Sequence, residues 1–199
     1  MNTVDYNKLR TSIRYTFIGM AYIDKRYYVC LKALQYAEGM HTGVRKDNVT
    51  KEFYHQLNIV GYLLTLHGSL IDPVAVYVTA LLHDVYEDYP VTRQYLTDNF
   101  GEFMPFILRV SKIRDGIKVP YTVYFSDMSE CHVTSVVKGA DRLHNLSTME
   151  GVFSEEKQLK YKEEVDKYFL PMLKYARRKF PEQTTAYENL KCILNMYCK

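Results

Sequence analysis

The chain of 199 residues contains no Trp, only 6 Pro and only 9 Gly. So few Pro and Gly leave little room for flexible linkers, and the length suits one domain, so a single domain over residues 1–199 is expected. No apolar run approaches the roughly 20 residues that a membrane-spanning helix needs. The N-terminus also lacks the apolar core of a secretory signal. These absences exclude a membrane partner and predict a cytoplasmic protein.

The net charge is small, and cysteines are few. Lys and Arg together number 26 against 23 Asp and Glu, which gives a net charge of +3. Because the basic residues are scattered rather than clustered, no nucleic-acid partner is expected. The four cysteines form no Cys-x-x-Cys pair, and they are predicted to be reduced, structural thiols at Cys30, Cys131, Cys192 and Cys198.

Almost every segment shows helical spacing of its apolar residues, and no stretch shows the strict alternation of a strand. The sequence therefore predicts an all-α helical bundle. Helices are expected at 24–40, 51–66, 74–85, 92–99, 101–112, 123–133, 134–147, 155–180 and 182–197, with a loop at 115–121.

The segment from Val74 to Val85 is apolar nearly all round. Its many β-branched residues would also suit a strand. Asp72-Pro73 is a good helix start, with Asp as N-cap and Pro at the first helical position. We therefore expect a helix that is buried at the centre of the domain.

Chemistry first becomes visible where this apolar helix ends. His83 and Asp84 are followed by Glu87 and Asp88. Ionised carboxylates are costly to bury without a partner, and a divalent metal ion neutralises them well. The alternative is a charged helix end in solvent, which the preceding apolar run disfavours.

Two further clusters are weak when taken alone. Asp141 and Asn145 are four residues apart and share a helical face. His41, Arg45 and Lys46 precede a segment that carries His55. Of the other histidines, His67, His132 and His144 are expected to be structural.

Together, the clusters resemble the HD-domain metal phosphohydrolases, and more narrowly the hydrolase domain of the RelA/SpoT family, which includes small alarmone hydrolases. The resemblance covers residues 30–150. It is carried by four ordered motifs, which are His41-Thr42-Gly43-Val44-Arg45-Lys46, Tyr54-His55, Ala80-Leu81-Leu82-His83-Asp84-Val85-Tyr86-Glu87-Asp88 and Ala140-Asp141-Arg142-Leu143-His144-Asn145.

The chain departs from the family pattern around the first two motifs. The family usually has Gln where Val44 stands and Pro where Gln56 stands. Its Gly-Pro-Tyr-Ile segment is replaced here by residues 49–54. These departures concern the loop around the site and the choice of substrate rather than the metal ligands.

The resemblance implies roles for ten residues. One divalent ion, Mn²⁺ in this family, would be bound by His55, His83, Asp84 and Asp141. Proton transfer would be handled by Glu87 and Asp88, and a guanine nucleotide would be bound by Arg45, Lys46, Asn145 and Thr148. His41 and His144 match no ligand position and are expected to be structural.

The implied activity is metal-dependent hydrolysis of the 3′-pyrophosphate of the alarmone ppGpp, which gives GDP and pyrophosphate. Two alternatives stay open. The chain could be an HD phosphohydrolase for another nucleotide, or a non-catalytic nucleotide-binding module. The full set of predicted ligands, together with Glu87 and Asp88, favours an enzyme. The sequence does not determine the oligomeric state.

Overall fold

A computed structural model describes residues 5–114 and 116–198, and its all-α architecture confirms the predicted fold class. Residues 1–4, Asp115 and Lys199, which the predicted single domain and loop include, lie outside the described residues. The helices are α1 (Tyr6–Ile23), α2 (Tyr28–Met40), α3 (Tyr54–Thr65), α4 (Pro73–Asp88), α5 (Arg93–Phe100), α6 (Met104–Val110), α7 (Tyr121–Ser129), α8 (His132–Ser147), α9 (Glu155–Glu164), α10 (Leu170–Lys179) and α11 (Thr184–Cys198).

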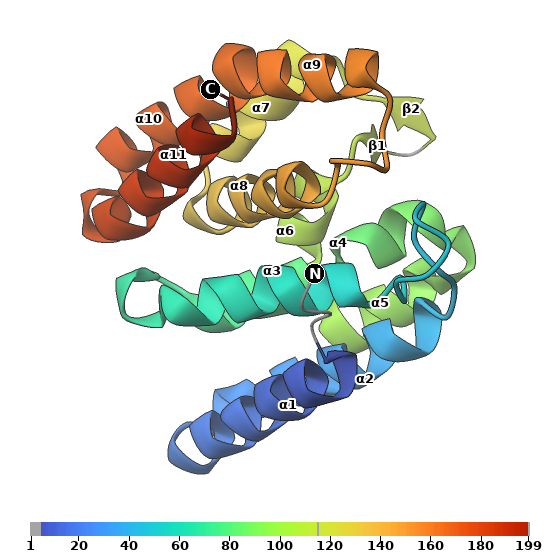
Figure 1. The fold of residues 1–199 in the computed structure, drawn as a ribbon. Helices are drawn as coiled ribbons and strands as arrows, with labels where there is room; N and C mark the ends of the chain where they lie inside the picture. The colour runs from blue at the N-terminus through green and yellow to red at the C-terminus, as the bar shows by residue number, and fades with distance from the viewer. Residues whose placement is uncertain (1–4, 115, 199) are drawn as a thin grey trace.

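The helices are arranged in successive layers (Figure 1). At one end α1 packs on α2 and α3, and at the other end α10 and α11 pack on α8. Helices α3, α4 and α8 lie between them and contact one another. A site built from these three helices is therefore supported by packing on both sides.

Helix α4 is the buried central helix that the sequence predicts. Asp72 caps it by accepting a hydrogen bond from the backbone N–H of Ala75 at 3.1 Å, and Pro73 is its first residue. Its side chains from 74 to 83 are all buried, because α2, α3, α6 and α8 pack around it.

No helix is predicted before residue 24, yet α1 is one of the longest helices. Asp5 caps it through the backbone N–H of Lys8. Ile13, Phe17 and Ala21, spaced four residues apart, form its buried face. This spacing is the signal that could have revealed the helix.

The loop predicted at 115–121 includes a short strand and the first residue of a helix. Strands β1 (Ile113–Arg114) and β2 (Ile117–Lys118) form a short antiparallel hairpin, and α7 begins already at Tyr121. Gly116 has a φ of +77°, which lets the chain reverse there. Each strand has only two residues, so no alternating pattern could appear in the sequence.

The helix predicted at 155–180 is interrupted. A π-helical segment, η5 (Val165–Phe169), separates α9 from α10 and directly precedes Leu170 and Pro171. Because Pro171 has no N–H, it cannot donate the hydrogen bond that would continue regular α-helix to residue 167.

All four cysteines are free thiols, as predicted; Cys30 and Cys131 are buried. No helix among the described residues is long and apolar enough to span a membrane. The extent of the single domain stays a prediction.

Candidate functional site

Helices α3, α4 and α8 bring the four predicted metal ligands together. His55 comes from α3, His83 and Asp84 from α4, and Asp141 from α8. Ligand atoms of His55, His83 and Asp84 lie within 4.8 Å of one another. The Nε2 atom of His55 is 3.2 Å from Oδ1 of Asp141 and 3.6 Å from Oδ2 of Asp84. Segments far apart in the sequence thus converge on one point.

The two histidines turn their Nε2 atoms toward this point. Nδ1 of His83 is 2.8 Å from the carbonyl oxygen of Ala80, so this nitrogen carries the proton and donates it. Nε2 of His83 is buried and has no hydrogen-bond partner among the described residues. A buried, unpartnered lone pair beside a carboxylate fits a bound cation.

His55 is oriented by a residue that was expected to be only structural. Its Nδ1 lies 2.7 Å from Nδ1 of His144, and both rings are buried. Burial, together with His55 and Arg45, lowers the pKa of His144 to about 3, which keeps it neutral. A neutral His144 can accept the Nδ1 proton of His55, and this hydrogen bond orients the ring with Nε2 toward the other ligands.

Asp84 is held by Gln56, the residue that departs from the family pattern. Nε2 of Gln56 donates to Oδ2 of Asp84 at 3.0 Å. Burial would raise the pKa of Asp84, but the charges of His83 and His55 outweigh it and lower that pKa. The lowered pKa favours an ionised Asp84 carboxylate, which suits a cation ligand.

Asp141 has two partners on its own helix. Nζ of Lys138 lies 2.7 Å from its Oδ2, and Nδ2 of Asn145 donates to its Oδ1 at 2.6 Å. Against the effect of burial, Lys138 and His55 hold the pKa of Asp141 well below its usual range. Lys138 is not among the predicted site residues, although its position three residues before Asp141 could have indicated the ion pair.

The donor set fits a divalent transition metal. Two imidazole nitrogens and two carboxylates are the ligands that Mn²⁺, Fe²⁺ or Zn²⁺ accept, whereas Ca²⁺ prefers oxygen alone. The burial of the cluster fits a metal as well, because a cation would neutralise carboxylate charges that are costly to bury.

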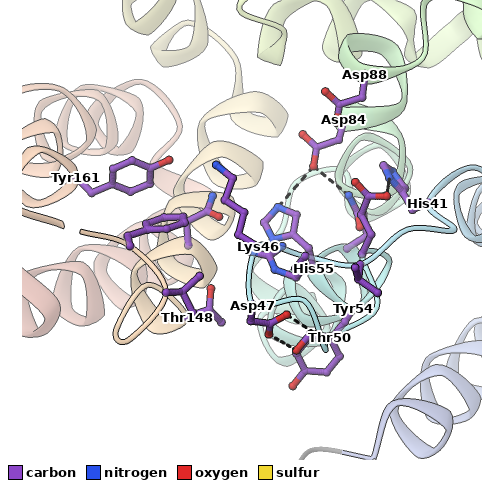
Figure 2. Close-up of a pocket in the computed structure, with 17 residues that line it drawn as sticks. His41, Lys46, Asp47, Thr50, Tyr54, His55, Asp84, Asp88, Thr148 and Tyr161 are labelled. Atoms are coloured by element: carbon purple, nitrogen blue, oxygen red, sulfur yellow. Dashed lines mark hydrogen bonds and ion pairs between the residues drawn. The ribbon is translucent and has the colours of Figure 1, made fainter. Parts of the chain in front are cut away.

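A cavity of about 380 Å³ opens beside this cluster (Figure 2). All four predicted nucleotide-binding residues line it, as do Asp84 and Asp88. Three aromatic residues for which no role is predicted also line it, namely Tyr54, Phe153 and Tyr161. The cavity is therefore acidic near α4, and elsewhere it mixes aromatic and polar residues with both basic and acidic ones, the acids being Asp47 and Glu52.

The loop before α3 carries Arg45 and Lys46 into this cavity. Asp47 shapes the loop by accepting backbone hydrogen bonds from Val49 at 3.0 Å and Thr50 at 2.8 Å. Asn48 has a φ of +58°, a conformation that Asn tolerates better than most residues. Burial lowers the pKa of Arg45.

The two predicted acid–base residues point in different directions. Asp88 lines the cavity, and burial together with the charges of Asp84 and Glu87 raises its pKa to about 6. The Glu87 carboxylate instead accepts hydrogen bonds from Ser111 Oγ at 3.2 Å and from the backbone N–H of Lys112. It therefore anchors the segment that follows α6.

His41 also lines the cavity, but it is not close enough to join the metal cluster. Its ring is buried beside Phe53 and Tyr89, and neither ring nitrogen has a hydrogen-bond partner among the described residues. Burial lowers its pKa. Nδ1 of His41 is 3.9 Å from Oε2 of Glu52, which is too far for a hydrogen bond.

Comparison with known proteins gives consistent relatives. The chain is 32% identical over 147 residues to guanosine-3′,5′-bis(diphosphate) 3′-pyrophosphohydrolase of Spiroplasma citri, which is 69% of this chain and 19% of the relative. It is 30% identical over 150 residues to GTP pyrophosphokinase rsh of Brucella melitensis, covering 71% of this chain and 19% of the relative.

A guanosine-3′,5′-bis(diphosphate) 3′-pyrophosphohydrolase of Aquifex aeolicus is 28% identical over 156 residues, covering 71% of this chain and 20% of the relative. The chain thus spans about one fifth of the length of these curated relatives. No family model matches the sequence.

Proposed function

The chain is homologous to the hydrolase region of the RelA/SpoT family of ppGpp hydrolases and synthetases, and from this premise we propose that it hydrolyses ppGpp. Water would attack the phosphorus bonded to the ribose 3′-oxygen. The bond between them would break, which gives GDP and pyrophosphate. The observation that carries the proposal is the His55, His83 and Asp84 cluster at the edge of a cavity that Arg45 and Lys46 line.

His55, His83, Asp84 and Asp141 would hold one divalent ion, which we propose to be Mn²⁺. When bound, such an ion polarises the phosphate and makes water more acidic. The residues around the ligands fix their geometry. Gln56 orients Asp84, and Lys138 and Asn145 orient Asp141.

Asp88 would handle the proton of the attacking water. With a pKa of about 6, its carboxyl group is mostly ionised at neutral pH and can still return a proton to the leaving 3′-oxygen. Glu87 would support this step through its negative charge, which contributes to the raised pKa of Asp88. Both acids are therefore proposed to act in catalysis, with Asp88 nearest the substrate.

The nucleotide would be held by the remaining lining residues. Arg45 is suited to stack on a base or to bind phosphate with its flat guanidinium group. Lys46 supplies a second positive charge at the cavity, and Asn145 and Thr148 would line the base and ribose. Arg45→Ala should weaken nucleotide binding while leaving the metal content unchanged.

The test is incubation with a panel of nucleotides that includes ppGpp, with and without Mn²⁺, followed by chromatography of the products. The Asp84→Asn variant should lose both bound metal and activity. Asp98→Asn is a matched control, because Asp98 is an exposed residue of α5. Release of GDP and pyrophosphate from ppGpp by the wild type and the control alone would support the proposal.

Other outcomes separate the alternatives. Turnover of other nucleotides with little ppGpp hydrolysis would indicate a different phosphohydrolase. Nucleotide binding without any turnover would indicate a binding module. Equal metal content in the wild type and Asp84→Asn would show that the metal assignment is wrong.

A further inference from the structure

Helix α9 contributes Tyr161 to the wall of the cavity, yet little in its own sequence holds it there. Each of the ten residues of α9 is described, and none of them is buried. The helix is rich in Glu and Lys, so it has little apolar surface with which to pack on α8 and α11. The position of Tyr161 must therefore depend on a few specific contacts.

Arg142 of α8 provides such contacts. The central carbon of its guanidinium group lies 4.2 Å from the centre of the Tyr161 ring and 4.5 Å from the centre of the Phe169 ring. Its Nη2 atom donates to Oε2 of Glu164, the last residue of α9, at 2.6 Å. The exposed fractions of the two charged side chains are only 7% and 12%. Because water is largely excluded, both the ion pair and the attraction to the rings are strengthened.

Arg142 faces α9 although its neighbour in the sequence faces the metal cluster. Successive residues of a helix point about 100° apart. The carboxylate of Asp141 meets His55, whereas the guanidinium group of Arg142 meets Glu164. Arg142 is not among the residues that line the cavity, so its effect on a bound molecule would pass through Tyr161.

Tyr161 in turn packs on Phe153. The centres of the two rings are 5.5 Å apart, and the edge of one ring meets the face of the other. Both residues line the cavity, and Figure 2 shows Tyr161 across it from His55 and Asp84. Phe153 and Tyr161 therefore form an aromatic wall that faces the metal cluster, and Arg142 supports this wall from behind.

We propose that Arg142 is a positioning residue, which holds the aromatic wall in place and thereby raises the affinity for the nucleotide without contacting it. The inference rests on the proposed function for its substrate. A wall that is fixed before binding does not have to be ordered by the ligand, so less affinity is lost when the ligand binds. The turnover number should depend little on Arg142, because the metal cluster and Asp88 belong to helices other than α9.

Arg142→Lys is the test variant. Lysine keeps a positive charge beside Glu164, so the buried carboxylate stays paired, but it lacks the flat group that stacks between the rings. The KM for ppGpp should rise about tenfold, while kcat stays within about twofold of the wild-type value. The metal content should not change. A loss of bound metal would show that Arg142 acts through Asp141, and it would overturn the proposal.

Arg10→Lys is the matched control. Arg10 forms an ion pair with Glu38 at 2.5 Å, which joins α1 to α2, and neither residue lines the cavity. This variant should keep the wild-type KM. An equal rise of KM in Arg10→Lys and Arg142→Lys would overturn the proposal, since it would reflect only the general loss of an Arg–Glu pair.

A double-mutant cycle tests whether Arg142 acts through Tyr161. Tyr161→Leu removes the ring and should itself raise the KM, whereas Tyr161→Phe keeps the ring and should not. Adding Arg142→Lys to Tyr161→Leu should raise the KM by less than about twofold further, because the two residues share one interaction. An undiminished effect of Arg142→Lys in the Tyr161→Leu protein would overturn the proposed route.

Hydrogen exchange tests the position of α9 without any turnover. The backbone amides of α9 should exchange faster in Arg142→Lys than in the wild type, while those of α3 and α4 should exchange at the same rates. Equal acceleration in all three helices would indicate a general loss of stability and would overturn the positioning role.

Binding of GDP, measured by calorimetry, separates this inference from the proposed function. Arg142→Lys should bind GDP about tenfold more weakly than the wild type does. If the wild type does not hydrolyse ppGpp but its GDP affinity depends on Arg142 in this way, the function is wrong while the positioning role stands. If ppGpp is hydrolysed with an unchanged KM in Arg142→Lys, the positioning role is wrong while the function stands.

Discussion

The buried pair of Lys138 and Asp141 links the stability of the fold to the metal cluster. Both side chains are almost fully buried, and the ion-pair distance is 2.7 Å. Lys138→Met removes the positive charge while keeping a side chain of similar length. Because Lys138 helps to hold the pKa of Asp141 low, the Asp141 carboxylate loses its main buried cationic partner.

The expected cost follows from the burial of the pair. Removing one partner of a buried ion pair costs about 3–5 kcal/mol. For a protein of this size, that loss lowers the melting temperature by about 6–20 °C. Lys112 lies near both groups, and Lys138 lowers its pKa. Without Lys138, Lys112 can partly replace the missing positive charge beside Asp141. The loss of unfolding free energy should therefore lie near ~3 kcal/mol, the lower end of the range.

The assay is thermal unfolding followed by circular dichroism, with a chelator and then with Mn²⁺. A divalent ion beside Asp141 would replace the missing charge, so Mn²⁺ should stabilise Lys138→Met more than the wild type. Adding Asp141→Asn should restore much of the lost stability in the chelator. Lys160→Met is the exposed control.

Equal melting temperatures for Lys138→Met and Lys160→Met would refute the argument that the buried pair stabilises the fold. An equal effect of Mn²⁺ on Lys138→Met and on the wild type would instead refute the placement of Asp141 at the metal.

Four further predictions concern other parts of the site and its support. His144→Ala should weaken metal binding about 10–100-fold in equilibrium dialysis, because the ligand His55 loses its orienting partner. Asp88→Asn should stabilise the metal-free protein at pH 8. The pKa of Asp88 is raised from 3.8 to about 6, so the stability linked to its protonated form is present below about pH 4 and lost as the pH rises through 6. Urea unfolding should therefore show Asp88→Asn to be more stable than the wild type at pH 8, and no such gain at about pH 4. Gly139→Ala should destabilise the protein by about 1–3 kcal/mol, because an added Cβ would lie 3.1 Å from a Leu190 methyl group. Gly61→Ala, with its nearest contact at 3.7 Å, should stabilise it by up to about 1 kcal/mol; a loss as large as that of Gly139→Ala would contradict the packing argument.

Local features of the sequence were enough to predict the helical architecture and the central helix. The Asp72-Pro73 start and the apolar run after it identified α4, because capping and burial act within one segment. The ordered motifs also predicted which residues would gather around His55 and Asp84, and the structure brings them together there except for Glu87, which faces Lys112. Their chemical roles stay predictions. Relationships within one helix, such as that of Asp141 and Asn145, follow from spacing alone.

Contacts between distant segments could not be predicted from that spacing. His55 and His144 are 89 residues apart in the sequence, and only the packing of α3 on α8 makes them partners. Glu87 and Asp88 are neighbours in the sequence, yet one faces Lys112 and the other the cavity. Lys46 and Lys157 are far apart in the sequence, yet both lie over the ring of Phe153. Spacing determines which residues share a helical face, whereas tertiary packing decides what that face meets.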